Sequence, residues 1–240
     1  MVGGESKPTI VLVHGAFADS SGFDAVIRRL LADGYPVVAA SNALRGVASD
    51  AAAVKALLGS VEGPIVLVGH SYGGAIISTA AAGSEQVQAL VYLAAFIPDT
   101  GEAVGELVAK FPGSTVNESL KAVPLTDGQV DLYIDPAVYH SRFAADVPTE
   151  DAAVYAIAQR PAAAAAFGEP ATGPQAWNTI PAFTLISGAD LIIPPETQEF
   201  MAKRAGATVQ VVEGASHLVF VSHPDTTVAF IQQAAHETAR

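Results

Sequence analysis

Short apolar runs alternate along the chain with longer stretches in which apolar residues recur every three or four positions. Runs rich in valine, isoleucine and leucine, closed by glycine, proline or polar residues, predict buried strands. They lie at residues 9–13, 36–40, 65–68, 87–96, 183–187 and 208–212. The stretches with helical spacing lie at residues 24–33, 49–58, 74–82, 194–206 and 225–235. This alternation implies right-handed crossovers and an α/β fold with a mainly parallel sheet of about six strands flanked by helices.

Residues at the helix ends support several of these boundaries. Gly34 follows the first helix, where a glycine adopts the left-handed backbone of a C-terminal cap without steric cost. Ser49 is the predicted N-cap of the second helix, because a serine oxygen accepts a hydrogen bond from a free N–H there. The helix at 194–206 starts with proline and glutamate and ends with basic residues and glycine, as the helix dipole favours.

The alternation stops between residues 99 and 178. This segment contains no strand pattern, and its helix-like stretches lie at residues 102–110, 136–145, 150–159 and 162–166. Open α/β sheets bind ligands at the carboxyl ends of their strands, so a helical insertion after the fourth strand predicts a cap above the site. We therefore expect one domain over residues 1–240, with a core at 1–98 and 179–240. A separate second domain is the alternative interpretation.

Composition limits the possible partners and compartments. The 240 residues are 50% hydrophobic and carry a net charge of −12 with only 12 lysines and arginines, which argues against nucleic acid or an anionic membrane as partner. The absence of cysteine excludes a disulfide framework, a thiolate nucleophile and a cysteine metal site. No apolar run reaches the length of a membrane span. Residues 1–8 lack the pattern of a signal peptide, so the expected location is cytoplasmic.

A candidate nucleophile follows the third predicted strand. The sequence Gly69-His70-Ser71-Tyr72-Gly73 stands between an apolar strand and a helix of small residues. A serine held there needs a strained backbone and glycines on both sides, which is the arrangement of a nucleophile elbow. Ser71 is therefore predicted to project its Oγ from the top of the sheet, beside a helix N-terminus.

A serine alcohol is a weak nucleophile, so the elbow requires a histidine base and an acid that orients it. Asp190 comes just after the fifth predicted strand, and His217 comes just after the sixth. The chain order serine, aspartate, histidine is typical of α/β-hydrolases. Asp99, after the fourth strand, is the alternative acid. Three other histidines compete with His217 for the role of base. His223 is predicted to organise the start of the last helix, and His140 and His236 are predicted to lie on the surfaces of helices.

The tetrahedral intermediate of acyl transfer needs two N–H donors. One is predicted to be Tyr72, directly after the nucleophile. The other is Ala16 in the loop after the first strand, because Gly15 allows the tight turn that points the next amide inward. The ring of His14 is expected to hold this loop by a hydrogen bond, and His70 is expected to pack beside the sheet.

A resemblance to a known family rests on the residues His14-Gly15-Ala16, Gly69-His70-Ser71-Tyr72-Gly73-Gly74, Asp190 and Gly214-Ala215-Ser216-His217. The set resembles the α/β-hydrolase superfamily. The early first strand is similar to the compact branch that contains plant methylesterases, hydroxynitrile lyases and many bacterial hydrolases. In the lyases of that branch, a threonine replaces the glycine at Gly15 and a lysine stands at Leu218. The resemblance therefore implies ester hydrolysis rather than lyase activity.

These observations predict a serine hydrolase that cleaves a small, largely apolar carboxylic ester through an acyl-enzyme, without a metal or an organic cofactor. Amides, carbamates and lactones remain open as substrates, and the chain is expected to be a monomer or a homodimer. The alternatives are a cofactor-free haloperoxidase or oxygenase, a hydroxynitrile lyase, and a ligand-binding receptor with the same fold. The aromatic candidates for the substrate pocket are Phe17, Phe96, Tyr133, Tyr139, Phe143, Tyr155, Phe167 and Trp177.

Overall fold

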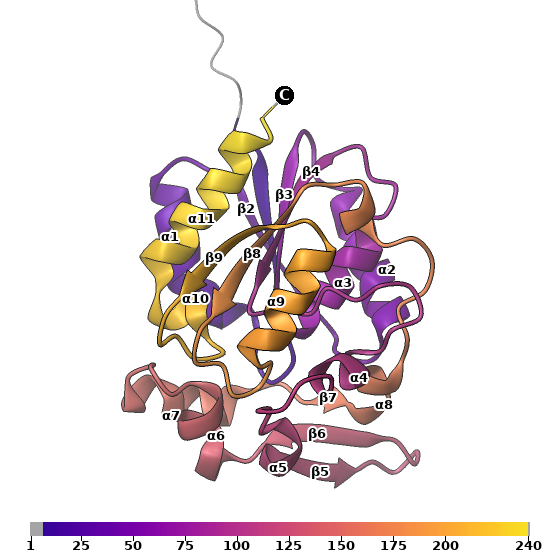
Figure 1. The fold of residues 1–240 in the computed structure, drawn as a ribbon, viewed down its shortest axis with the longest axis vertical. Helices are drawn as coiled ribbons and strands as arrows, with labels where there is room; N and C mark the ends of the chain where they lie inside the picture. Colours follow the sequence, from indigo (N-terminus) through magenta and orange to yellow (C-terminus); the bar gives the residue numbers. More distant parts are fainter. Residues whose placement is uncertain (1–6, 240) are drawn as a thin grey trace, which may run out of the picture.

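The computed structural model describes residues 7–239 and has the predicted α/β architecture (Figure 1). Its main sheet has six strands in the order β2-β1-β3-β4-β8-β9, and every neighbouring pair is parallel. The strands are β1 (Thr9–Val13), β2 (Val37–Ala40), β3 (Ile65–His70), β4 (Val87–Leu93), β8 (Ala182–Ser187) and β9 (Thr208–Val212). The predicted mainly parallel sheet of six strands is confirmed.

Helices cover both faces of this sheet (Figure 1). One face carries α1 (Asp24–Ala32), α10 (Val219–Ser222) and α11 (Pro224–Glu237), and α11 packs against β3, β4 and β8. The other carries α2 (Val47–Leu58), α3 (Tyr72–Ala80) and α9 (Pro195–Arg204). Short 3-10 helices lie at Ser20–Phe23 and Ala176–Asn178. Because helices cover both faces of the sheet, side chains on both sides of the inner strands are buried, and the sequences of these strands are continuous apolar runs.

The central strands form the core. Every residue of β1, β3 and β8 is buried, whereas the edge strand β9 is exposed along most of its length. The fourth strand ends at Leu93, three residues before the predicted end, because Ala94 adopts a φ of 42° that breaks the extended backbone. The apolar pattern continues to Phe96 since these residues stay buried after the strand has ended.

The expectation of an all-helical cap is wrong. The segment 99–178 contains a three-stranded antiparallel sheet of β5 (Leu120–Pro124), β6 (Val130–Ile134) and β7 (Ala162–Ala163). The β5–β6 hairpin turns at Asp127-Gly128, where Gly128 has a φ of 83°. An Asp-Gly pair between strands is a recognised hairpin signal, and it was present in the sequence. The alanine run starts as a strand because it pairs with Asp131 and Leu132, and only its later part is helical.

The remaining cap elements are helical and lie beyond the carboxyl edge of the main sheet (Figure 1). They are α4 (Val104–Val108), α5 (Val116–Ser119), α6 (Pro136–Phe143), α7 (Thr149–Ala158) and α8 (Ala164–Gly168). A single cluster of buried apolar side chains includes residues of the sheet and of this cap. The division into a core and a cap within one domain stays a prediction.

The start of α2 corrects the predicted N-cap. The helix begins at Val47, and the Ser49 hydroxyl donates to the Gly46 carbonyl. The free N–H groups of Val47 and Ala48 instead donate to the Glu169 carboxylate at 2.7 and 3.0 Å. A carboxylate at a helix N-terminus is favoured by the dipole. A residue of the segment 99–178 therefore binds the free N–H groups at the start of α2. Glu169 is so far from α2 in the sequence that no local pattern indicates this contact.

Within residues 7–239, no helix is long and apolar enough to cross a membrane. The prediction about a leader segment rests in part on residues 1–6, which lie outside the described residues.

Replacing Glu169 tests this contact between cap and core. We expect Glu169→Ala to lower the free energy of unfolding by about 1 kcal/mol, because two N–H groups at the start of α2 lose a charged acceptor. Urea denaturation measures the change. Glu85→Ala, at an exposed glutamate in a turn, is the control and should change the free energy by less than about 0.5 kcal/mol. Equal effects of the two substitutions would show that the contact is not stabilising.

Candidate active site

Ser71 occupies a strained turn between β3 and α3. Its backbone has φ 53° and ψ −122°, a conformation that is uncommon for a residue with a side chain. The flanking glycines make the turn possible. A Cβ on Gly69 would lie 2.7 Å from the Gly73 carbonyl oxygen, and one on Gly73 would lie 2.5 Å from the Val13 carbonyl oxygen. The sequence therefore places glycine where the backbones approach too closely for any side chain.

The structure brings together the three residues that the sequence singled out for catalysis. The Ser71 Oγ lies 2.9 Å from His217 Nε2, and His217 Nδ1 lies 2.7 Å from Asp190 Oδ2. The three residues are buried, with Ser71 5% exposed. The alternative acid, Asp99, accepts a hydrogen bond from the Thr100 N–H in a turn instead. This line of two hydrogen bonds can move a proton from the serine to the imidazole while the carboxylate holds the ring.

The Asp190 carboxylate is held by more than the histidine. Its Oδ1 accepts the backbone N–H groups of Ile192 and Ile193 at 2.8 and 3.0 Å, and its Oδ2 accepts Gln198 Nε2 at 2.9 Å. Gln198 is fully buried on α9, and its Oε1 accepts the Ser187 N–H. Sequence reasoning missed Gln198. A single glutamine on an amphipathic helix gives no local signal that it turns inward to a carboxylate.

The loop after β1 carries the predicted second oxyanion donor. Neither the Ala16 N–H nor the Tyr72 N–H has a hydrogen-bond acceptor among residues 7–239. His14 Nδ1 lies 2.9 Å from the Gly15 carbonyl, and the Asn42 N–H donates to His14 Nε2 at 3.2 Å. The prediction that His14 holds this loop is confirmed. Burial lowers the pKa of His14, so its ring acts there as a neutral group.

The His70 ring packs directly against the imidazole of His217. It is fully buried, its Nε2 lies 3.0 Å from the His217 carbonyl oxygen, and the two rings are 4.7 Å apart. Its Nδ1 has no partner among the described residues. Burial, and then the nearby His217, lower the pKa of His70 well below the usual 6.5. His70 is therefore a neutral donor that fixes the backbone of the His217 loop.

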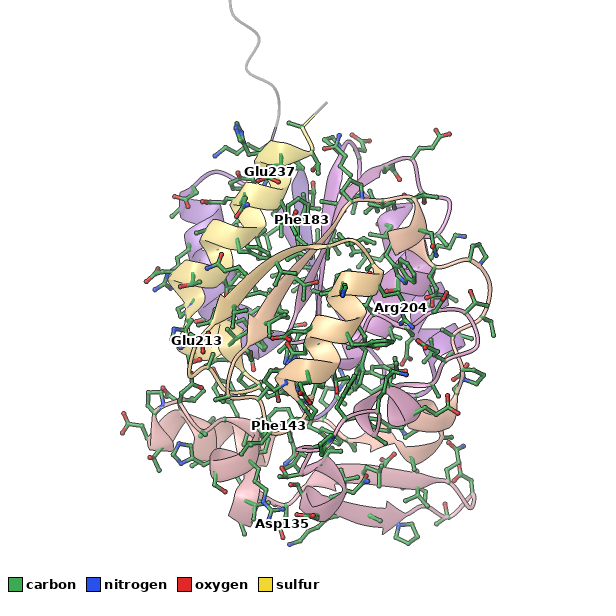
Figure 2. All side chains as sticks on the ribbon, viewed as in Figure 1. Asp135, Phe143, Phe183, Arg204, Glu213 and Glu237 are labelled. Atoms are coloured by element: carbon green, nitrogen blue, oxygen red, sulfur yellow. The ribbon has the colours of Figure 1, made fainter. Side chains whose placement is uncertain are left out.

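Four of the aromatic candidates gather beside His217. The Phe143 ring meets the His217 ring edge-on at 4.9 Å and lies 4.8 Å from the Tyr139 ring. Phe17 stands 6.2 Å from Phe143 and stacks on Phe167 at 5.9 Å. Figure 2 shows Phe143 at the junction between the cap and the sheet. The cap therefore places an aromatic ring, Phe143, directly against His217.

Other pocket candidates lie elsewhere. Tyr133 lines a groove on the cap with Val123, Pro136 and Ile157. Trp177 donates through its Nε1 to the Pro98 carbonyl, with Arg204 over its ring. Tyr155 lines a small pocket between α7 and the loop after β1. Phe96 touches the elbow through its backbone, since its N–H donates to the Ser71 carbonyl. Tyr155 shares that small pocket with Tyr139, whereas Tyr133 and Trp177 make their contacts away from His217.

A cap carboxylate reaches the loop that carries His217. The Ser216 hydroxyl donates to Asp146, which lies between α6 and α7, and His223 Nε2 lies 3.1 Å from the same carboxylate. His223 also accepts the Thr227 N–H through its carbonyl, which confirms its expected place at the start of α11. Although burial opposes it, hydrogen bonds from Ser216 and Ser222 lower the pKa of Asp146 and keep it ionised. No local sequence pattern indicates this contact.

Comparison with known proteins agrees with the fold. A sequence model of the alpha/beta hydrolase family matches residues 10–230. The chain is 29% identical to the alpha/beta hydrolase nvfD of Aspergillus novofumigatus, over 96% of this chain and 98% of that protein. It is 26% identical to the putative methylesterase 19 of Arabidopsis thaliana, over 97% and 99%. A pyrethroid hydrolase from Sphingobium faniae JZ-2 superposes with a TM-score of 0.78 and 25% identity, over 97% and 98%.

The lowered pKa of His70 predicts a loss of stability in mild acid. Below pH 6.5 the unfolded chain binds a proton on this imidazole and the folded protein does not, so unfolding becomes more favourable as the pH falls. Between pH 7.5 and 5.5 we expect His70 to remove about 1.4 kcal/mol from the free energy of unfolding. Urea denaturation of wild type and His70→Gln at both pH values measures this. The variant should lose correspondingly less, and an unchanged pH dependence would contradict the prediction.

Proposed function

Because the chain belongs to the alpha/beta hydrolase family, we propose that it is a carboxylic ester hydrolase that forms an acyl-enzyme on Ser71. The likeness to a methylesterase and to a pyrethroid hydrolase supports this reaction class. The observation that carries the proposal is the line of hydrogen bonds from Asp190 through His217 to Ser71. A buried serine with an imidazole on its Oγ is equipped for attack on a carbonyl carbon.

In the first step, Ser71 Oγ bonds to the ester carbon while His217 Nε2 takes the serine proton. The carbonyl oxygen becomes an oxyanion, and the N–H groups of Ala16 and Tyr72 stabilise it. Asp190 holds the ring and balances the imidazolium charge. The bond to the alcohol then breaks, and His217 returns the proton to the departing oxygen. Ser71 is left acylated.

In the second step, water attacks the acyl-enzyme by the same route. His217 takes a proton from the water, the two N–H donors again hold the oxyanion, and the proton returns to Ser71 Oγ as the acid leaves. The chain's own side chains and amides supply every group that this sequence of steps needs.

The proposed substrate is a small, largely apolar ester. The Phe143 ring lies against the imidazole, and it continues through ring contacts to Phe17, Tyr139 and Phe167. Such an apolar surface favours a substrate without charge. Lyase chemistry is less well supported. A Cβ at Gly15 would lie 2.7 Å from both the His70 carbonyl oxygen and the Ser71 Cβ, so the threonine of the lyases does not fit this backbone. Leu218 stands buried where those enzymes carry lysine.

Replacement of the nucleophile tests the proposal. We expect Ser71→Ala to reduce kcat for p-nitrophenyl butyrate by at least about 10⁴-fold, since the covalent step is lost. A fluorophosphonate probe should add to wild type once, on the peptide that contains Ser71, as peptide mass spectrometry detects. Ser60→Ala, at an exposed serine that bonds to the Leu57 carbonyl, should keep both activity and labelling. A wild type that binds ligands but neither labels nor hydrolyses any ester would exclude the proposed function.

Phe143 is expected to limit substrate length. Phe143→Leu opens space beside His217, so the ratio of kcat/KM for p-nitrophenyl octanoate to that for the acetate should rise by roughly threefold to tenfold. Phe183→Leu is the control, because this buried ring packs on Phe230 at the end of the sheet remote from the cap (Figure 2). A chain-length series of esters measures the ratio. An identical ratio in wild type and both variants would place Phe143 outside the pocket.

A further inference from the structure

A cap tyrosine contacts the oxyanion loop by a hydrogen bond. Tyr139 is on α6, is 1% exposed, and donates through its hydroxyl to the Phe17 carbonyl oxygen at 3.2 Å. Phe17 is the residue directly after Ala16, the proposed oxyanion donor. The two residues are 122 positions apart in sequence. Burial raises the pKa of the Tyr139 hydroxyl, so it remains a protonated donor across the working pH range.

The residue that receives this hydrogen bond is strained. Phe17 has a φ of 61°, in the left-handed region that a bulky side chain rarely adopts. Such a conformation persists only when its surroundings hold it in place. Two kinds of contact from the cap do so. The Tyr139 hydroxyl donates to the carbonyl, the Phe143 ring meets the Phe17 ring edge-on at 6.2 Å, and the Phe167 ring stacks on it at 5.9 Å.

The strain at Phe17 bears directly on the oxyanion site. The peptide between Ala16 and Phe17 connects the two residues, so a rotation that relaxes φ at Phe17 also turns the backbone of Ala16. The Ala16 N–H would then point away from the position of the reacting oxygen. Oxyanion donors work only when they are fixed at hydrogen-bonding distance before the reaction.

We propose that Tyr139 is a positioning residue of the oxyanion hole. Its hydrogen bond holds Phe17 in the left-handed conformation and thereby aims the Ala16 N–H at the oxyanion. This inference rests on the proposed function, because the oxyanion exists only if Ser71 attacks a carbonyl. It assigns to the cap a part in stabilising the transition state, in addition to covering the substrate.

Tyr139→Phe tests the proposal by removing one hydroxyl and leaving the ring. We expect kcat for p-nitrophenyl butyrate to fall about tenfold with KM changed less than twofold, because the oxyanion and not the bound ester loses its donor. The inhibition constant of an aryl trifluoromethyl ketone should rise by a similar factor. In that adduct Ser71 Oγ bonds to the ketone carbon, His217 takes the serine proton, and the ketone oxygen becomes the oxyanion. Ser141→Ala, which removes an exposed hydroxyl from the same helix, should change neither value.

A thermal unfolding curve separates a positioning role from a structural one. Loss of a single hydrogen bond should lower the Tm of Tyr139→Phe by only about 2–4 °C, so the assays are made on folded protein. Unchanged kcat and inhibitor affinity would overturn the proposal while leaving the hydrolase function intact. A parallel loss in kcat and rise in KM, without a change in inhibitor affinity, would also overturn it. The proposed function itself is tested by a separate result. If it is wrong, the fluorophosphonate does not label the wild-type protein.

Discussion

The close approach of backbones around Ser71 is the constraint on which the rest of the molecule depends. The serine lies in a turn with positive φ, and the glycines around it have no room for a Cβ. Gly69 faces the backbone of Gly73 across the turn, Gly73 faces the Val13 carbonyl at the end of β1, and Gly74 faces the Phe96 carbonyl after β4. This turn lifts the Oγ out of the sheet and toward His217. The remaining loops at the carboxyl edge then need only deliver their side chains to one point.

The buried Asp190 carboxylate at that point is held by several hydrogen bonds. An isolated carboxylate in an apolar interior would be costly, yet Asp190 accepts two backbone N–H groups, Gln198 and His217. His70 in turn holds the carbonyl of His217. Networks of this kind hold the acid and the imidazole in a fixed orientation inside the protein. The cost of burying the charge is thereby offset by hydrogen bonds that also define the geometry.

The core of the fold and the approach of the three candidate residues to one another were predictable, because the information that specifies them is local. Apolar runs, glycine spacing and the chain order of Ser71, Asp190 and His217 all lie in the sequence itself. The cap sheet was missed although its Asp-Gly turn was visible. Glu169, Gln198 and Asp146 were missed for a different reason. Each acts on a partner chosen by the tertiary packing, and nothing near it in sequence indicates that partner.

The proposed mechanism depends on one acyl-enzyme that forms on Ser71. Partitioning between water and added methanol tests this most directly, with p-nitrophenyl, phenyl and trifluoroethyl esters of a single acid as substrates. All three esters give the same acyl-enzyme, which has already lost the alcohol of the substrate. The proposed mechanism therefore predicts the same ratio of methyl ester to free acid from all three substrates. A ratio that changes with the leaving group would mean that water attacks the ester directly, and would contradict hydrolysis through an acyl-enzyme on Ser71.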